Sequence, residues 1–200
     1  MRRAETMNKI LTTLFCAVLV LTMAAEPAAC FSLFRDKPGS THDHSSLNAP
    51  KTIRSQELTE FSAAFTTSGT PVPDGKAAAL CPVGRYTLIL KKTPKGAYYR
   101  ALCDNGTKPI DLECTVDASA LKYLQSVIAK DGLARINGFS KKNSAVGEYL
   151  DLTVRYASGE KISAYAEGGI SAIAGAHWDP YLYIGAFRTI AENNGHRFIK

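Results

Sequence analysis

The sequence has few of the residues, and none of the short motifs, that identify common enzyme classes. It contains one tryptophan, three methionines and five cysteines in 200 residues. No Cys-x-x-Cys pair occurs, so the chain lacks the signature of a redox dithiol or a zinc knuckle. A His-Glu-x-x-His motif and a phosphate loop ending in Gly-Lys-Ser/Thr are also missing. The sequence therefore predicts no metal and no cofactor.

Basic residues do not gather into a single surface. The net charge is +6, yet the lysines and arginines are scattered, and runs such as Lys91-Lys92 and Lys141-Lys142 are only pairs. Nucleic-acid-binding domains usually carry a basic stripe or patch. We therefore predict no nucleic-acid partner, and we interpret the basic pairs as solvated turn residues.

A long hydrophobic run is missing as well. The longest apolar segment, residues 10–25, has about 16 residues, whereas a membrane-spanning helix needs roughly 20. Basic residues precede this segment, and the small residues Ala28 and Ala29 follow it after a Glu-Pro break. A basic start, a short apolar segment and small residues at its end are typical of a signal peptide. We therefore predict that residues 1–29 direct export from a bacterial cytoplasm.

Cys30 directly follows the two alanines. Bacterial lipoprotein signals end in two small residues and a cysteine that becomes lipidated, and Ala28-Ala29-Cys30 resembles that ending. Pro27 stands where such signals usually carry an aliphatic residue. Two alternatives remain open: a lipoprotein held at a membrane through Cys30, and an unmodified periplasmic or secreted protein.

The remaining chain divides into a linker and one folded domain. Residues 30–54 are rich in polar residues, proline and glycine, which indicates a flexible linker. Residues 55–200 have the length of one globular domain. The linker would suit a tether between a lipid anchor and this domain.

Six segments of the domain have the pattern of strands. In the best of them, Leu150, Leu152, Val154 and Tyr156 alternate with polar residues. The first segment also fits a helix, but its threonine and phenylalanine content favours a strand. The predicted strands are residues 57–67, 85–91, 97–103, 110–116, 150–156 and 161–166.

Two helices are predicted from their ends. Asp117 is a suitable N-cap for the first helix, and Gly132 stands where a helix ends. Asp179 and Pro180 start the second helix, whose Leu182, Phe187 and Ile190 should face the core. Hairpins without βαβ crossovers indicate an α+β fold: an antiparallel sheet of five to six strands with two main helices on one face.

Three cysteines lie inside the predicted domain: Cys81, Cys103 and Cys114. Disulfides form in oxidising compartments outside the cytoplasm. One disulfide among these three is therefore expected, with the third cysteine buried as a thiol. The sequence does not select the pair.

The stretch from Val116 to Phe198 resembles a recurring, largely uncharacterised type of bacterial exported protein or lipoprotein domain. The resemblance rests on Ile136-Asn137-Gly138-Phe139, the strand at 150–156, the Ala157–Ile162 turn and Pro180-Tyr181. It implies an α+β envelope domain and no particular activity.

The candidates for an active site are few. His177 could serve as a general base with a cysteine thiolate as nucleophile, which would make the protein a small extracytoplasmic hydrolase. No recognisable catalytic motif surrounds His177, and Asp179 is explained as a helix cap. Catalysis is therefore the second hypothesis.

Amphipathic aromatic residues favour the alternative, a binding or interaction module. Tyr165 and Trp178 are the candidate binding residues, because tyrosine and tryptophan are enriched at recognition surfaces. Tyr165 is the better exposed candidate, since Ile162, Ala164 and Ala166 take the inner face of its strand. The expected partner is an unidentified ligand or protein of the cell envelope.

Overall fold

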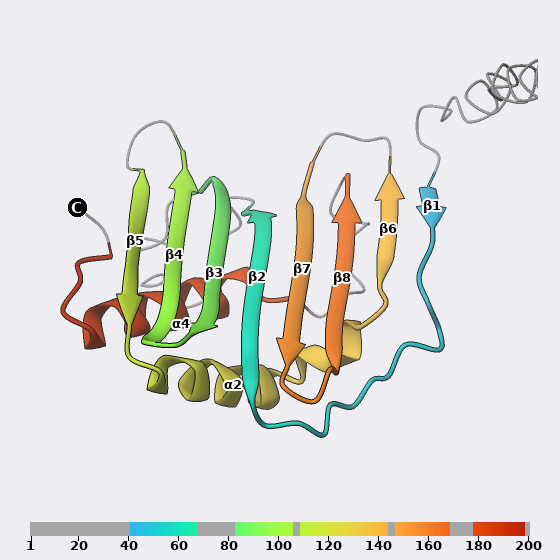
Figure 1. Ribbon diagram of the computed structural model, residues 1–200. Helices are drawn as coiled ribbons and strands as arrows, with labels where there is room; N and C mark the ends of the chain where they lie inside the picture. The colour runs from blue at the N-terminus through green and yellow to red at the C-terminus, as the bar shows by residue number, and fades with distance from the viewer. Residues whose placement is uncertain (1–40, 68–82, 106–108, 144–146, 169–177, 199–200) are drawn as a thin grey trace, which may run out of the picture. The chain divides into compact units, whose positions relative to one another are not determined.

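Eight strands of the described residues form one mixed sheet in the order β1-β6-β8-β7-β2-β3-β4-β5 (Figure 1). The computed structural model describes residues 41–67, 83–105, 109–143, 147–168 and 178–198. The strands are β1 (Thr41–Asp43), β2 (Leu58–Thr66), β3 (Arg85–Thr93), β4 (Gly96–Asp104), β5 (Ile110–Val116), β6 (Ser140–Asn143), β7 (Tyr149–Tyr156) and β8 (Lys161–Glu167).

One half of the sheet, β2 to β5, is built from neighbours in sequence. Strands β3, β4 and β5 form an antiparallel meander, and β2 pairs antiparallel with β3. Thr93 pairs with Gly96 at the tight turn between β3 and β4, where Gly96 has a φ of 139°. A side chain at Gly96 would collide with the carbonyl oxygen of Val116, so this turn requires glycine.

The other half joins segments that are distant in sequence. The β7–β8 hairpin pairs through β7 with β2, while β6 runs parallel to β8 and β1 pairs with β6. The six predicted strands correspond to β2, β3, β4, β5, β7 and β8, and the α+β class is confirmed. The prediction of five to six strands, all antiparallel, was wrong. It missed β1 and β6, whose polar sequences lack the apolar alternation of a half-buried strand.

Two α-helices of the described residues pack on the same face of the sheet. They are α2 (Ser119–Asp131) and α4 (Pro180–Asn193), and the 3₁₀ helix η1 (Leu133–Ile136) follows α2. Helix α2 begins one residue later than an Asp117 cap predicts, although Asp117 still accepts the Ser119 N–H at 2.8 Å. Gly132 ends α2 with a φ of 71°, as its position in the sequence predicted.

Helix α4 covers an aromatic core. Phe187 contacts the rings of Phe61 and Tyr99 at centroid distances of 5.7 and 5.3 Å, and the Tyr99 hydroxyl donates to the Phe187 carbonyl. The prediction that Leu182 faces this core was wrong, because its side chain is 38% exposed and Tyr183 is buried instead. Phe187 and Ile190 lie in the core as expected.

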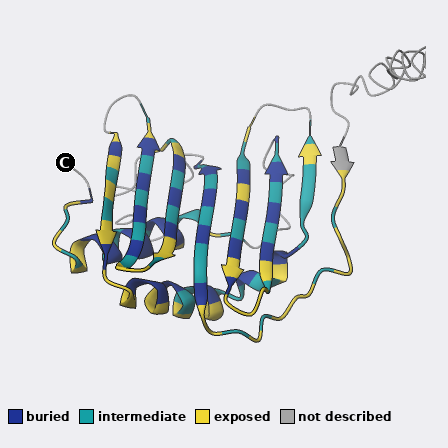
Figure 2. Ribbon diagram, viewed as in Figure 1, coloured by how far each residue is buried: buried dark blue, intermediate teal, exposed yellow. Residues whose placement is uncertain are grey.

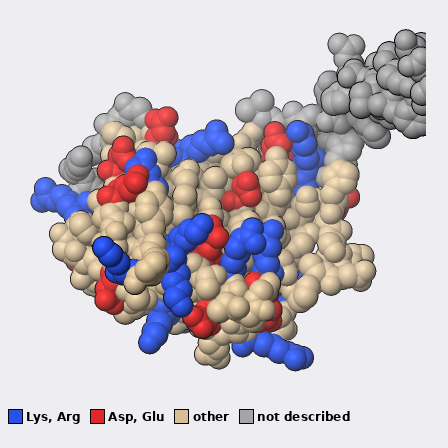
Figure 3. Space-filling view, viewed as in Figure 1, with Lys and Arg blue, Asp and Glu red and all other residues tan. Residues whose placement is uncertain are grey.

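The opposite face of the sheet carries no helix of the described residues. Buried and more exposed residues alternate along β2, β4 and β7, as the two-residue period of a strand requires (Figure 2). On the face seen in Figure 3, acidic and basic side chains are interspersed. Arg100, for example, pairs with Asp111 at 2.8 Å and with Glu113 at 2.9 Å. This face therefore presents no charge of a single sign.

Candidate functional site

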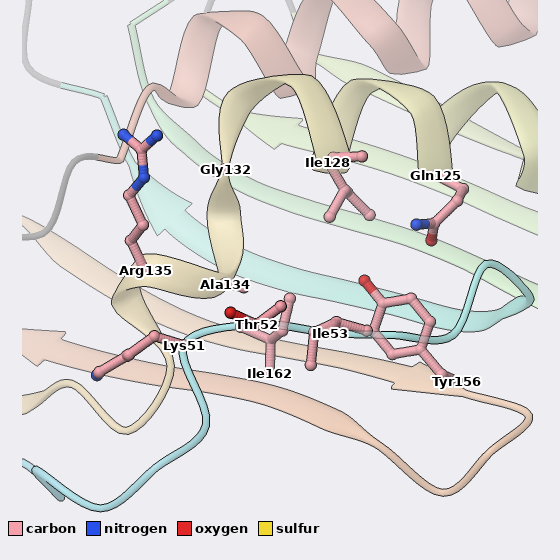
Figure 4. A pocket seen from close by; sticks show the side chains of 11 residues that line it. Lys51, Thr52, Ile53, Gln125, Ile128, Gly132, Ala134, Arg135, Tyr156 and Ile162 are labelled. Carbon is pink, nitrogen blue, oxygen red and sulfur yellow. The ribbon is translucent and has the colours of Figure 1, made fainter.

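A cavity of about 230 Å³ lies where the chain before β2 crosses the C-terminal part of α2 (Figure 4). We call residues 50–55 the strap and this cavity the strap pocket. Its walls come from the strap, from α2 and η1, and from β7 and β8. The lining residues are Lys51, Thr52, Ile53, Gln125, Ile128, Ala129, Gly132, Ala134, Arg135, Tyr156 and Ile162.

Asn137 attaches the first part of the strap to the sheet. Its side-chain amide donates to the Pro50 carbonyl and accepts the Ser163 N–H of β8, both at 2.9 Å. Its own carbonyl accepts a hydrogen bond from the Lys51 ammonium. Asn137 is 5% exposed, and satisfied polar groups of this kind fix the position of the segments that they join.

Gly138 allows the chain before the strap to approach closely. It has a φ of 76°, and a side chain there would collide with Ala49 and lie 2.8 Å from the Ser46 carbonyl oxygen. The Ser46 N–H also donates to the Gly138 carbonyl at 2.8 Å. The Asn137-Gly138 pair singled out in the sequence is thus the point where the N-terminal segment docks.

Glu160 attaches the end of the strap. Its carboxylate, in the turn between β7 and β8, accepts the backbone N–H groups of Arg54 at 2.9 Å and Ser55 at 2.8 Å. These hydrogen bonds and that of the Ser158 hydroxyl lower the pKa of Glu160. The expected linker was residues 30–54. In the structure, strand pairing starts at Thr41 and the strap is joined to the sheet through Asn137 and Glu160.

Tyr156 and Gln125 form the polar end of the strap pocket. Burial, with a smaller contribution from the Glu160 charge, raises the pKa of the Tyr156 phenol to about 12, while a hydrogen bond from Gln125 opposes this shift. Tyr156 is therefore a protonated hydrogen-bond donor at neutral pH. The Gln125 side-chain oxygen is buried and has no hydrogen-bond partner among the described residues.

Lys51 and Arg135 lie on the side of the pocket opposite Tyr156 and Gln125; both are exposed, and Figure 4 shows their charged head groups pointing away from each other. No carboxylate of the described residues forms a salt bridge with either side chain. The pocket lining contains no acidic residue. Between the two ends lie the apolar side chains of Ile53, Ile128 and Ile162. The pocket can thus hold a small molecule that has an apolar body and polar ends.

The two predicted binding residues lie on opposite faces of the sheet, and neither lines the strap pocket. Trp178 is half-buried on the helix side, stacked on Tyr183 with ring centroids 4.7 Å apart. Tyr165 is half-buried on the uncovered face, and its hydroxyl donates to Glu167 at 2.6 Å. Asp179 caps α4 as predicted, accepting the Tyr181 N–H at 3.0 Å. His177 and Cys30 lie outside the described residues.

Cys103 and Cys114 are both free thiols, and the sheet register excludes a disulfide between them. Cys103 pairs with Ile110, whereas Cys114 pairs with Tyr99. Four residues along a strand span about 13 Å, and a disulfide needs Cα atoms within about 7 Å. Burial raises the pKa of both thiols, which keeps them in the poorly nucleophilic neutral form. Cys81 lies outside the described residues.

The described residues contain no cluster of three or more His, Cys, Asp or Glu side chains that could hold a metal. Within the same residues, no helix is both long and apolar enough to cross a bilayer. The pocket residues were missed because the strap was assigned to a linker and the first predicted helix was described only by its ends. Ile53, an isolated aliphatic residue in a polar segment, was the available signal that the strap packs against the domain.

Comparison with known proteins identifies no relative. No family model matches the chain, and neither a curated protein nor a solved structure matches it. The function must therefore be argued from the geometry of the chain itself.

Proposed function

We propose that this protein is a non-catalytic binding module of the bacterial cell envelope, and that the strap pocket is its ligand site. The observation that carries the proposal is a preformed cavity of about 230 Å³ with an apolar middle and polar ends. Ligand sites are typically concave, mostly apolar and equipped with a few oriented polar groups.

The way the strap is held supports the same proposal. Asn137 donates a hydrogen bond to the strap and Glu160 accepts two from it, which holds the strap over the end of α2, so the pocket exists before a ligand arrives. A site that is already formed avoids the cost of ordering the chain on binding. Export rests on the signal-like residues 1–29, and attachment to a membrane rests on Cys30.

A screen of small ring compounds tests the pocket. Compounds that bind should shift the NMR signals of pocket residues in the mature protein. Ala129→Trp, which adds a large side chain at the pocket, should abolish these shifts. Ser126→Trp is the matched control, because Ser126 is exposed on the same helix and is not a pocket residue. Equal binding to both variants would place the ligand elsewhere.

The intact mass and membrane partitioning of the protein made in a bacterial host test its location. A mass that starts at Cys30 and includes diacylglycerol and acyl groups would identify a lipoprotein. An unmodified, shortened chain in the soluble fraction would leave a free periplasmic or secreted protein. A full-length chain retained in the cytoplasm would refute export.

A further inference from the structure

One polar spot lies beside the apolar middle of the strap pocket, and it is formed by Tyr156 and Gln125. Tyr156 is 4% exposed, and its ring forms part of the pocket wall (Figure 4). Gln125 extends toward the Tyr156 ring from α2, and its amide donates a hydrogen bond to the phenol. A ligand in the pocket would meet this pair as its nearest uncharged polar side chains.

Tyr156 keeps hydrogen-bonding capacity that the protein does not use. A phenol hydroxyl has one donor and two acceptor sites, and among the described residues only Gln125 forms a hydrogen bond with it. Tyr156 therefore has an unused O–H donor. If the amide oxygen and nitrogen are exchanged, Tyr156 donates to Gln125 and keeps unused acceptor sites instead. A hydroxyl group on a ligand both donates and accepts, so it can bond to Tyr156 in either orientation of the amide.

The same spot has no partner for a charged group. The pocket lining contains no carboxylate that would balance a cation. Lys51 and Arg135 are exposed, and their head groups point away from the apolar middle of the pocket (Figure 4). Burial and the Glu160 charge raise the pKa of the Tyr156 phenol, which shows that a negative charge is unfavourable there. Because an unpaired charge is costly to bury, an uncharged ligand is favoured.

The apolar middle sets the size of the ligand. Ile128 and Ile162 are buried side chains of α2 and β8, and Ile53 of the strap closes the space between them (Figure 4). A cavity of about 150 Å³ holds a benzene molecule, so a volume of about 230 Å³ suits one ring with a small substituent.

We propose that the strap pocket binds a small, uncharged ring compound that carries a hydroxyl group. The ring contacts Ile53, Ile128 and Ile162, and the hydroxyl forms a hydrogen bond with Tyr156. This inference rests on the proposed function, since it names the ligand class of the same site.

Four probes with the same benzene ring separate the parts of the proposal: benzyl alcohol, toluene, benzoate and benzylammonium. Each is titrated into the mature protein at neutral pH, with the NMR signals of pocket residues as the readout. Benzyl alcohol should bind about fivefold more tightly than toluene, because it adds one hydrogen bond between neutral groups. Benzoate and benzylammonium should bind no more tightly than toluene, since their charges find no partner beside Tyr156.

Variants assign these effects to side chains. Tyr156→Phe keeps the ring and removes the hydroxyl, so benzyl alcohol and toluene should bind equally well. The affinity for toluene should stay at its wild-type value, which reports that the pocket is intact. Tyr165→Phe is the matched control, because it removes a hydroxyl outside the pocket lining and should leave every affinity unchanged. Lys51→Gln and Arg135→Gln should also leave the affinity for benzyl alcohol unchanged.

The outcomes distinguish this inference from the function on which it rests. If benzoate or benzylammonium binds as tightly as benzyl alcohol, the pocket binds ligands but the uncharged class is wrong. A fivefold preference for benzyl alcohol that survives Tyr156→Phe, or that Tyr165→Phe also removes, would overturn the assignment of the hydroxyl to Tyr156. If none of the probes shifts a pocket signal, and the ring-compound screen finds no binder, both the inference and the proposed function fail.

Discussion

The two halves of the sheet are stabilised in different ways. From β2 to β5, neighbouring strands pair in register and bury large aromatic side chains beneath α4. From β7 to β1, the structure depends on segments that meet from distant parts of the chain, and polar groups such as Asn137 and Glu160 attach the strap. The strap pocket lies in the second half. We therefore expect substitutions in the first half to change the unfolding free energy most, and substitutions in the second half to change the shape of the pocket.

The largest expected effect is in the aromatic half. Replacing Phe187 with Ala removes a fully buried ring that contacts Phe61 and Tyr99. Such truncations cost about 3–5 kcal/mol of unfolding free energy. Urea denaturation measures this loss. Leu182→Ala on the same helix should cost less, about 1 kcal/mol, because Leu182 is 38% exposed and is not one of the fully buried core residues. Equal losses for the two variants would contradict the assigned core.

Asn137→Ala should detach the strap from the sheet. It should lower the unfolding free energy of the whole protein by less than Phe187→Ala does. It removes the bonds to Pro50 and Ser163 and leaves two partly buried backbone groups unpaired, at a cost of about 1–3 kcal/mol. Hydrogen exchange should show that protection is lost first in residues 44–55 and only later in β3 to β5. Asn194→Ala is a matched control near α4, since Asn194 also makes two side-chain hydrogen bonds. It should leave exchange in the strap unchanged.

Glu160 should make the attachment of the strap dependent on pH. Hydrogen bonds from the Arg54 and Ser55 backbone and the Ser158 hydroxyl lower the pKa of Glu160 in the folded protein below its ordinary value of 4.5. A carboxyl with a lowered folded-state pKa stabilises the fold above the unfolded-state pKa, and this contribution is lost as the pH falls through the folded-state value.

Glu160→Gln keeps an acceptor but removes this titration. The unfolding free energies of wild type and variant should differ most near pH 7 and converge as the pH falls below 4.5. Urea unfolding from pH 7 to pH 3 measures the difference between the two proteins. A difference that stays constant over this range would show that the Glu160 charge does not hold the strap.

The smallest effect is expected on the uncovered face. Tyr165→Phe removes one hydrogen bond to Glu167, on a side chain that is only half-buried. Stability should change by less than about 1 kcal/mol, and binding at the strap pocket should not change. A loss of pocket binding in this variant would show that the two faces of the sheet act together.

Sequence reasoning succeeded where local pattern determines structure. The alternation in β7, the Gly132 helix end and the Asp179 cap were all predicted and are confirmed. Each depends on residues within a few positions of one another, which the hydrophobic period and capping rules describe.

The pocket half could not be predicted in the same way. Strand β6 has the sequence Ser-Lys-Lys-Asn and is recognised only by its backbone pairing with β1 and β8. The strap contributes single residues, such as Ile53, whose partners come from α2 and the β7–β8 hairpin. Pairing between distant segments is not visible in a local sequence pattern. The strap pocket could therefore be located only in the structure.

The docking of the strap has a practical consequence for anyone who shortens this chain. Ser55 looks like a natural starting point by composition, yet a protein starting there would keep β2 to β5 and lose β1 together with Lys51, Thr52 and Ile53. Such a fragment could fold and purify well yet lack the proposed binding, because one wall of the strap pocket had been cut away. Expression trials should therefore begin before Thr41, and a negative binding result from a shorter form should not be taken as a property of the whole protein.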